Sequence, residues 1–351
     1  MISRDVAIVG AGPIGIEMAV ALKRHDISYV QFDAKQVGQT MFWWPPMTRW
    51  FSSNERIAIA GVPLETVDQG KATREDYLRY LRTVVEQFDL EVKTFEPVVG
   101  IEKQSEGGFV VTTSPQRGKQ QYRLQKIILA TGGTAFPRKL DVKGEHLPHV
   151  SHYMSDPHSY FRKRVLIVGG RNSAVEAALR IHQVGADVTI SYRRNEFNAK
   201  SIKYWLYPEI MGLIRSGRIR AHFNTVVSEI TPSGARLASC DESRPLFGNP
   251  GSSFNVPADF VLLLVGYVAD MSLAKMAGVQ LVGENEIPVF DERTMETNVP
   301  GVYIAGTATG GTQARYRIFL ENCHIHIERI LAAIIGAPSP PTPEPLAQPE
   351  T

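Results

Sequence analysis

Hydrophobic and polar residues follow the order strand, turn, helix, strand at two separate places in the chain. In residues 5–34, the apolar strand DVAIV leads into a glycine turn, an amphipathic helix and a second strand, SYVQF. Residues 162–194 repeat this order, with the strand RVLIV, another glycine turn, the helix NSAVEAALRIHQ and the strand DVTISY. Because such units build parallel sheets covered by helices, the pattern predicts an α/β fold.

The first glycine turn reads GAGPIG, from Gly10 to Gly15. Gly10 permits a tight turn, Gly12 lets the backbone approach a pyrophosphate, and Gly15 allows close packing of helix on strand. The helix that follows offers amide donors and the positive end of its dipole. Asp33 ends the second strand, at the spacing where a carboxylate accepts a hydrogen bond from a ribose hydroxyl. We therefore predict a dinucleotide site here; a glycine-rich structural turn is the alternative.

The second glycine turn departs from this pattern. Gly169 and Gly170 are present, but Arg171 occupies the close-approach position and Ala174 stands at the last glycine position. The guanidinium of Arg171 either crowds the pyrophosphate or swings out and pairs with a phosphate. We expect the second arrangement, with a blocked site as the alternative.

The strand of the second unit ends at Arg193 and Arg194, where a site for NAD would place an acid. Adjacent arginines suit the 2′-phosphate of NADPH instead. The alternative is a pair of exposed arginines on a solvated loop.

The order of the remaining segments predicts a discontinuous first domain. Residues 72–89 have helical spacing, residues 91–113 read as strands, another strand ends at Thr131-Gly132, and a strand, a glycine turn and a long apolar helix close the chain. We predict two Rossmann-like, three-layer domains of the FAD/NAD(P)-binding class, the second inserted into the first: residues 1–139 and 256–336 form one, and residues 140–255 the other. Residues 337–351 are proline-rich, which predicts a disordered tail.

Composition narrows the possible functions. The formal charge of +2 gives no concentrated basic face for a nucleic acid. The apolar runs fall short of the roughly 18 residues that span a membrane, so we expect a cytoplasmic protein. The two cysteines, Cys240 and Cys323, lie far apart, which excludes a disulfide framework, a CxxC pair and a zinc cluster, and we expect no bound metal.

Several motifs together resemble a known family. The paired glycine turns, the ATG strand end at residues 130–132 and the PGVYIAGT segment at residues 300–307 resemble the flavoproteins of the thioredoxin reductase type, which have two dinucleotide domains. The segments TRWFSSNERIAIAGVPL, VGGRNSAVEAAL, SIKYWLYPE and IFLENCHIH are similar to the bacillithiol disulfide reductase subgroup. This resemblance implies an FAD domain built from both chain ends and an inserted NADPH domain.

The resemblance also implies a function. It predicts an FAD-dependent NADPH oxidoreductase that passes electrons through the flavin to a low-molecular-weight disulfide such as bacillithiol disulfide, working as a homodimer. The alternatives are electron transfer to a small redox protein, as in a ferredoxin or flavodoxin NADP reductase, a flavin monooxygenase, and a flavin redox sensor without catalysis. No catalytic side chain is assigned, because the two cofactors carry the hydride chemistry.

Carried over position by position, the resemblance implies the cofactor-binding residues. Those expected at FAD are Gly10, Gly12, Pro13, Ile14, Gly15, Asp33, Gln39, Thr40, Thr131, Gly132, Gly306 and Thr307. Those expected at NADPH are Gly169, Gly170, Arg171, Asn172, Ser173, Arg193 and Arg194. Thr307 departs from the usual aspartate of the family, and Ile14 stands where bacillithiol-type members often have a cysteine.

Four further features have two interpretations each. Trp43, Trp44 and Trp50 form either an aromatic wall beside a flat ligand or a plug between the domains. Cys323 is expected to be a small buried hydrophobe, with a redox role as the alternative. Lys203 and Trp205 border the nicotinamide or belong to an amphipathic helix. His324 and His326 are expected on different helix faces, so packing or surface roles are favoured over a metal pair.

Overall fold

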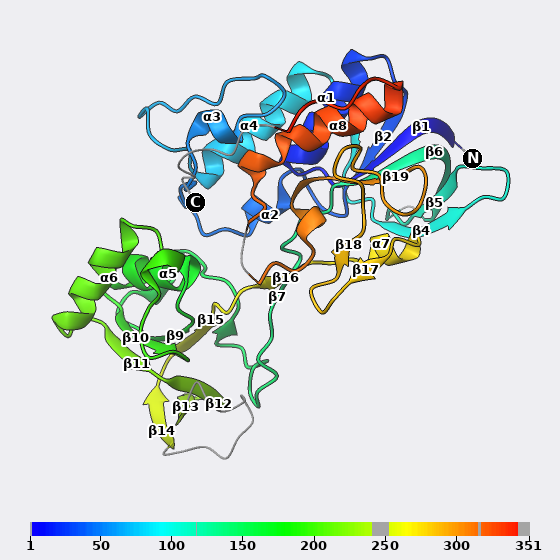
Figure 1. The fold of residues 1–351 in the computed structure, drawn as a ribbon. Coiled ribbons are helices and arrows are strands. Elements are labelled where there is room, and N and C mark those ends of the chain that lie inside the picture. The colour runs from blue at the N-terminus through cyan, green and yellow to red at the C-terminus, as the bar shows by residue number, and fades with distance from the viewer. Residues whose placement is uncertain (1, 117, 241–252, 315–316, 343–351) are drawn as a thin grey trace. The chain divides into compact units, whose positions relative to one another are not determined.

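The computed structural model describes residues 2–116, 118–240, 253–314 and 317–342, and in it the chain divides into two compact units. Unit 1 contains Met1–Trp43, Met47–Phe136 and Tyr267–Thr351, and unit 2 contains Trp44–Pro46 and Pro137–Gly266. In Figure 1, unit 1 has the blue, cyan and orange-to-red colours of the two chain ends, and the main part of unit 2 has the green and yellow-green of the middle.

Unit 1 is built on a seven-stranded sheet in the order β3-β2-β1-β6-β5-β4, with β19 also paired to β6. The parallel strands are β1 (Ile2–Val9), β2 (Tyr29–Phe32), β3 (Val92–Lys93), β6 (Gln120–Leu129) and β19 (Val302–Ile304). The antiparallel strands are β4 (Val98–Lys103) and β5 (Phe109–Thr113). Val9 lies opposite Leu129 in the register, and Leu129 lies opposite Ile304, so the carboxyl ends of β1, β6 and β19 meet at one edge.

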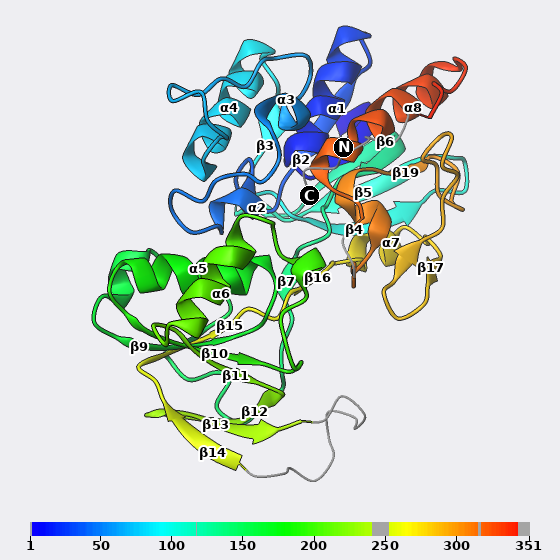
Figure 2. The ribbon, with the colours of Figure 1, turned by 60° about the vertical axis from the view of Figure 1, so that its left-hand side comes forward.

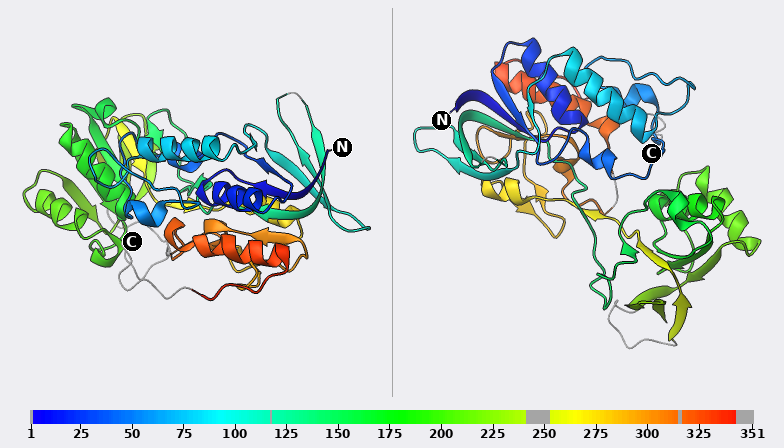
Figure 3. Two further views of the ribbon diagram at one scale, coloured as in Figure 1. Left: turned by 90° about the horizontal axis from the view of Figure 1, so that it is seen from above. Right: turned by 180° about the vertical axis from the view of Figure 1, so that it is seen from behind.

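Three helices of unit 1 pack together, with α1 (Pro13–Arg24) against both α8 (His324–Ile335) and α4 (Arg74–Gln87). Figures 2 and 3 show α1 and α8 side by side along the sheet. Pro13 suits the first position of α1, because its fixed φ is already helical and its missing N–H would lack a helical partner there. At α4, Thr73 and Asp76 form a reciprocal capping box.

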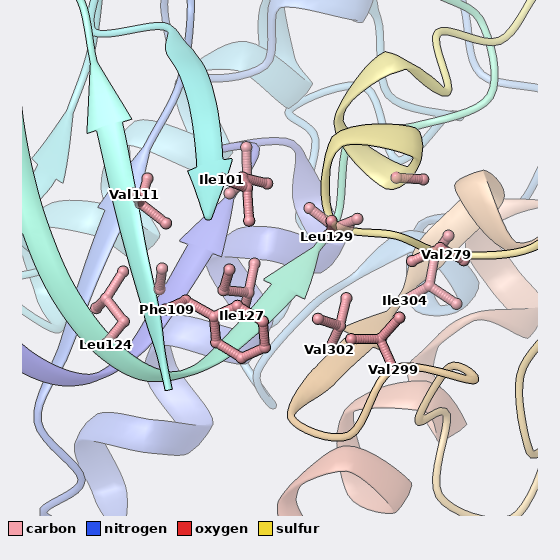
Figure 4. Packing of buried hydrophobic residues seen from close by; sticks show 14 of the residues in the cluster. Ile101, Phe109, Val111, Leu124, Ile127, Leu129, Val279, Val299, Val302 and Ile304 are labelled. Carbon is pink, nitrogen blue, oxygen red and sulfur yellow. The ribbon is translucent and has the colours of Figure 1, made fainter. Parts of the chain in front are cut away.

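The core of unit 1 joins the central strands to β4, β5 and α7 (Ser272–Met276). Figure 4 shows Ile127 and Leu129 of β6 among Ile101, Phe109 and Ile304, which come from three other strands. This packing fixes the strands whose ends carry the candidate site.

Unit 2 contains a five-stranded parallel sheet in the order β11-β10-β9-β15-β8. Its strands are β8 (Val150–Ser151), β9 (Arg164–Val168), β10 (Asp187–Tyr192), β11 (Arg220–Phe223) and β15 (Phe260–Leu263). The helices α5 (Asn172–Gln183) and α6 (Leu206–Arg215) contact each other. A three-stranded antiparallel sheet follows, formed by β12 (Thr225–Thr231), β13 (Gly234–Ser239) and β14 (Ser253–Pro257).

The predicted α/β fold class is confirmed, but the division of the chain differs from the predicted boundaries. Unit 2 extends to residue 266, beyond the predicted limit of 255, because β15 pairs with β9 along four residues. The stretch 144–161 lies inside unit 2 and supplies the edge strand β8. The chain passes between the units through β7 (Phe136–Pro137) and β16 (Tyr267–Val268), which pair with each other.

Short elements complete the described chain. They are α2 (Gln39–Phe42), α3 (Asn54–Ile57), the antiparallel pair β17 (Leu281–Val282) and β18 (Ile287–Pro288), and four 3-10 turns, Pro157–Tyr160, Ala199–Ser201, Gly306–Gly310 and Leu320–Asn322.

Of the predicted disordered tail, residues 343–351 lie outside the described residues. In its described part, Ser339 Oγ donates to the carbonyl of Arg293 at 2.6 Å. Among the described residues, every helix is too short or too polar to cross a membrane.

Candidate dinucleotide-binding sites

Steric constraints explain two glycines of the first turn. A Cβ on Gly10 would lie 2.3 Å from the carbonyl oxygen of Ala130, where β1 and β6 end side by side, and Gly10 also has a φ of +114°. A Cβ on Gly15 would lie 2.1 Å from the carbonyl oxygen of Gly10. Both clashes are with backbone, which cannot move aside as a flexible side chain does. The structure therefore needs glycine at both positions to bring α1 close to the strand ends.

Gly12 has a different environment. Apart from its chain neighbours and its own helix, no atom of the described residues lies within 4 Å of where a Cβ would stand. Its backbone is extended, with φ −75° and ψ 179°, and it is the N-cap of α1. Neither packing nor φ requires a glycine here. The open space beside the amides of a helix N-terminus fits a pyrophosphate.

Asp33 lies beside the first glycine turn and is hydrogen-bonded to it. Its Oδ2 accepts the N–H of Ala11 at 2.7 Å, and its Oδ1 accepts the N–H of Lys35 at 2.7 Å. Burial raises the pKa of Asp33, while the two backbone amides act in the opposite direction. Each carboxylate oxygen has a second lone pair, so Asp33 can hold the turn and still accept a bond from a ribose hydroxyl.

Two further segments reach the same edge of the sheet from β6 and β19. The N–H of Gly133, which follows Thr131 and Gly132, donates to Thr307 Oγ1 at 2.9 Å. Gly306 has a φ of +71°, and a Cβ there would lie 3.4 Å from the Cβ of Ile14. The structure thus brings segments from residues 10–15, 33, 131–133 and 306–307 together. Thr307, at the position of the family's aspartate, connects two of them.

The predicted flavin-side residues Gln39 and Thr40 begin α2, directly after Gly38. The N–H of Gly38 donates to the carbonyl of Ala11 at 3.0 Å, so α2 starts beside the first glycine turn. A φ of +71° suits glycine at position 38. The structure therefore places Gln39 and Thr40 in the same neighbourhood as Asp33.

In unit 2, the second glycine turn has the same backbone plan with different contacts. A Cβ on Gly169 would lie 2.4 Å from the carbonyl oxygen of Leu264, and one on Gly170 would lie 2.4 Å from the ring of Tyr192. Arg171 takes the N-cap position of α5, with an extended backbone and an exposed side chain. An arginine therefore fits this backbone without strain, and its guanidinium can reach a phosphate.

Asn172 and Ser173 form the first turn of α5. Asn172 Oδ1 accepts the N–H of Lys203 at 2.8 Å, so the amide side chain joins the glycine turn to the segment before α6. Lys203 itself is buried, with 8% of its surface exposed. Trp205 packs edge-to-face on the exposed Tyr204, with ring centroids 4.9 Å apart, and it is the N-cap of α6.

Arg193 and Arg194 come directly after β10, and both side chains are exposed. Their carbonyls are held: that of Arg193 accepts a bond from Cys240 Sγ at 3.2 Å, and that of Arg194 accepts the N–H of Asn224 at 2.9 Å. A fixed backbone with two solvated guanidinium groups suits the recognition of a phosphate dianion.

Trp50 is one of the three tryptophans in the segment 43–50, and its ring contact shows how this segment is held. Trp50 packs on Tyr77 of α4, with ring centroids 4.5 Å apart. Tyr77 in turn donates from its hydroxyl to the carbonyl of Ile57 at 2.8 Å, so these rings fix the segment on α4. The aromatic wall stays a prediction for Trp43 and Trp44, which are both half-buried.

Cys323 is completely buried, and its Sγ donates to the carbonyl of Phe319 at 2.9 Å. Burial, followed by the charge of Glu17, raises the pKa of its thiol. Because the thiolate is the reactive form, this environment makes Cys323 a poor nucleophile. It matches the predicted small buried hydrophobe.

Sequence reasoning missed the contacts of two histidines on α8. His324 Nδ1 lies 2.8 Å from Glu17 Oε2 of α1, and its Nε2 lies 3.0 Å from the carbonyl oxygen of Arg56. His326 Nδ1 accepts the N–H of Gly306 at 3.1 Å. Spacing along the chain could not reveal these pairs, because Glu17 and His324 are separated by 307 positions. Within the described residues, no group of three His, Cys, Asp or Glu side chains could hold a metal ion.

The chain is similar to known proteins in sequence and in fold. Residues 7–306 match the pyridine nucleotide-disulphide oxidoreductase family. The bacilliredoxin reductase Bdr of Bacillus subtilis is 36% identical over 334 residues, which is 95% of this chain and 98% of that protein. The solved structure of the bacillithiol disulfide reductase Bdr (YpdA) from Bacillus cereus has a TM-score of 0.87 and 34% identity, over 95% of this chain and 99% of that one. Its counterpart from Staphylococcus aureus has a TM-score of 0.86 and 30% identity, over 96% and 99%.

Proposed function

Because the chain belongs to the pyridine nucleotide-disulphide oxidoreductase family, we propose that it is an FAD-dependent NADPH oxidoreductase whose acceptor is bacillithiol disulfide. Membership in the family implies an enzyme with FAD and NADPH as its two cofactors. The observation that carries the FAD assignment is the open space at Gly12, the N-cap of α1, next to Ala11, whose N–H the Asp33 carboxylate accepts.

We assign FAD to unit 1. The amides at the start of α1 bind the pyrophosphate at Gly12, and Asp33 accepts from the adenosine ribose. Gln39, Thr40 and the segments at residues 131–132 and 306–307 enclose the rest of the molecule. Ile14, which lies against Gly306, adds an apolar surface that keeps water away from this site.

We assign NADPH to unit 2. Gly169, Gly170, Asn172 and Ser173 surround its pyrophosphate, and Arg171 pairs with a phosphate. Arg193 and Arg194 bind the 2′-phosphate and so select NADPH over NADH. When bound, the cofactors supply hydride transfer from the nicotinamide to the flavin and two-electron reduction of the disulfide, so that NADPH, a proton and one disulfide give NADP⁺ and two thiols.

The disulfide must accept its electrons without help from a protein dithiol. The chain has two cysteines and no CxxC motif, and Cys323 is buried. This distinguishes the proposed reaction from that of a reductase with its own dithiol. The chain's own residues bind and orient the two cofactors and exclude water from them, which is what hydride transfer between cofactors requires.

The test of the acceptor is NADPH oxidation by the FAD-loaded protein with either bacillithiol disulfide or a ferredoxin. Saturable turnover with the disulfide supports the proposal. Turnover with ferredoxin alone would replace it with the small-redox-protein alternative, and release of hydrogen peroxide without either acceptor would favour a flavin oxygenase or oxidase.

We also propose a cytoplasmic homodimer. The absence of a membrane-spanning helix among the described residues is compatible with this location. Light scattering of the FAD-loaded protein measures the mass directly: twice the chain mass of 38.9 kDa is expected, and a mass equal to one chain would contradict the dimer.

A further inference from the structure

Three side chains hold the Gly306–Gly310 turn of unit 1. His326 Nδ1 accepts the N–H of Gly306 at 3.1 Å, Thr309 Oγ1 donates to the carbonyl of Gly306 at 2.8 Å, and Thr307 Oγ1 accepts the N–H of Gly133 at 2.9 Å. Of these three, His326 is the titratable one, and it reaches the turn from α8, 20 positions along the chain. Its side chain is buried, with 9% of its surface exposed.

The hydrogen bonds set the protonation state of His326. Because the Gly306 N–H donates to Nδ1, that nitrogen carries no proton, and the imidazole is neutral with its proton on Nε2. His324 is the reverse: both of its ring nitrogens face acceptors, Glu17 and the Arg56 carbonyl, so both carry protons. The two histidines in this helical turn therefore differ in charge: His326 is neutral and His324 is a cation.

The surroundings agree with this contrast. Burial, helped by the cations Arg329 and His324, lowers the pKa of His326 to about 4. Burial also tends to lower the pKa of His324, but the hydrogen bond and charge of Glu17, with smaller contributions from the Arg56 carbonyl and Glu328, raise it above its usual value.

The Gly306 amide belongs to the turn that encloses part of the proposed FAD site, so the position of this turn affects FAD binding. The turn lies beside the first glycine turn, since a Cβ at Gly306 would lie 3.4 Å, an ordinary contact distance, from the Cβ of Ile14. A buried N–H without an acceptor is strongly destabilising, so loss of the imidazole forces the amide to find another partner. The turn can then shift away from Ile14 and Gly133.

We propose that His326 is a positioning residue for FAD. Its neutral imidazole accepts the Gly306 N–H and thereby fixes the Gly306–Gly310 turn beside the first glycine turn. The inference rests on the proposed assignment of FAD to unit 1. His326 acts through Gly306 and does not itself touch the cofactor.

Two variants at this position separate the acceptor from the packing. His326→Asn keeps an acceptor, because the asparagine oxygen can take the place of Nδ1, whereas His326→Leu removes it. Ile330→Ala, at a fully buried position of the same helix, is the control for general loss of packing. FAD affinity is measured by quenching of flavin fluorescence as the apoprotein takes up FAD.

We expect His326→Leu to bind FAD about tenfold more weakly, as an unsatisfied buried amide predicts. His326→Asn and Ile330→Ala should stay within about twofold of the wild type, even though Ile330→Ala lowers the melting temperature. Unchanged binding by His326→Leu, or equal weakening by Ile330→Ala, would overturn the inference. Wild-type protein that takes up no FAD would overturn the proposed function as well.

A pH series gives an independent readout and decides the matter if His326→Leu does not fold. As the pH falls toward and below the His326 pKa of about 4, protonation of Nδ1 breaks the Gly306 bond, so wild-type FAD affinity should fall more steeply there than that of His326→Asn. Both proteins keep Asp33, Arg329 and His324, so their difference reports position 326. Identical pH profiles would contradict the role of the imidazole.

Discussion

The two glycine turns of this chain share a backbone plan and differ in what surrounds it. Gly10 and Gly169 are each excluded from carrying a side chain by a carbonyl of a neighbouring strand end, Ala130 in unit 1 and Leu264 in unit 2. The N-cap of the following helix is Gly12 in unit 1 and Arg171 in unit 2, both in extended backbone. The difference is therefore chemical: open space in one turn, a guanidinium in the other.

The residues that follow the second strand of each βαβ unit also differ, in the sign of their charge. Asp33 follows β2 and binds the glycine turn through Ala11, whereas Arg193 and Arg194 follow β10 and leave their guanidinium groups in solvent. A carboxylate suits ribose hydroxyls, and arginines suit a phosphate. One supersecondary unit can thus be adapted to either cofactor by changing residues at two strand ends.

The largest expected effect is on the close packing at Gly15. Gly15→Ala puts a Cβ 2.1 Å from the Gly10 carbonyl oxygen, so α1 must move. We expect a loss of about 2–3 kcal/mol in the free energy of unfolding and no retained FAD, measured by denaturant unfolding and flavin content. Ala174→Gly is the matched change in unit 2, where about 1 kcal/mol is expected. Wild-type stability of Gly15→Ala would contradict the steric account.

The next effect concerns Gly12, where the ligand and not the fold needs the space. Gly12→Ala should leave the unfolding free energy of the apoprotein within about 0.5 kcal/mol, since no described side chain is displaced. FAD affinity should fall by about a hundredfold, the equivalent of about 3 kcal/mol. Titration of the apoprotein with FAD measures it. An unchanged affinity would place the pyrophosphate elsewhere.

The arginine pair should determine the choice of nicotinamide cofactor. Replacing Arg193 and Arg194 together by alanine should raise the KM for NADPH about tenfold to thirtyfold, since each charge-assisted bond contributes about 1.5–3 kcal/mol but both arginines are exposed. The KM for NADH should change little, and it serves as the internal control. Equal changes in both constants would show that the arginines do not recognise the 2′-phosphate.

The smallest effect is expected at Arg171. Arg171→Gly recreates the glycine of the first turn, and we expect the KM for NADPH to rise about threefold to fivefold, the contribution of an exposed ion pair of about 1 kcal/mol or less. A fall in KM would show the opposite, that the side chain obstructs the pyrophosphate.

Local patterns were sufficient to predict both βαβ units and the family. The apolar runs, the glycine spacing and Asp33 lie within about 30 residues of each other, and the resemblance to the thioredoxin-reductase type and to its bacillithiol disulfide reductase subgroup is confirmed. The antiparallel sheet β12–β14 was missed, because short and mostly exposed strands such as Ser253–Pro257 read as loop. The boundary after β15 was missed, because the pairing of β15 with β9 is a tertiary contact that the local pattern does not encode.

The supporting contacts of the site could not be predicted in this way. The hydrogen bonds between His326 and Gly306, between Thr307 and Gly133 and between His324 and Glu17 join distant segments, and no periodicity encodes them. They follow from the parallel sheet, which brings the ends of β1, β6 and β19 to one edge and packs α1 beside α8.

Anaerobic titration of the purified, FAD-supplemented protein with NADPH tests the central claim, that one chain holds FAD in unit 1 and NADPH in unit 2 for hydride transfer. We predict that one equivalent of NADPH per bound FAD bleaches the visible flavin absorbance, and that NADH at the same concentration does so far more slowly. Protein that stays colourless in excess FAD, or bound flavin that NADPH leaves oxidised, would contradict the account.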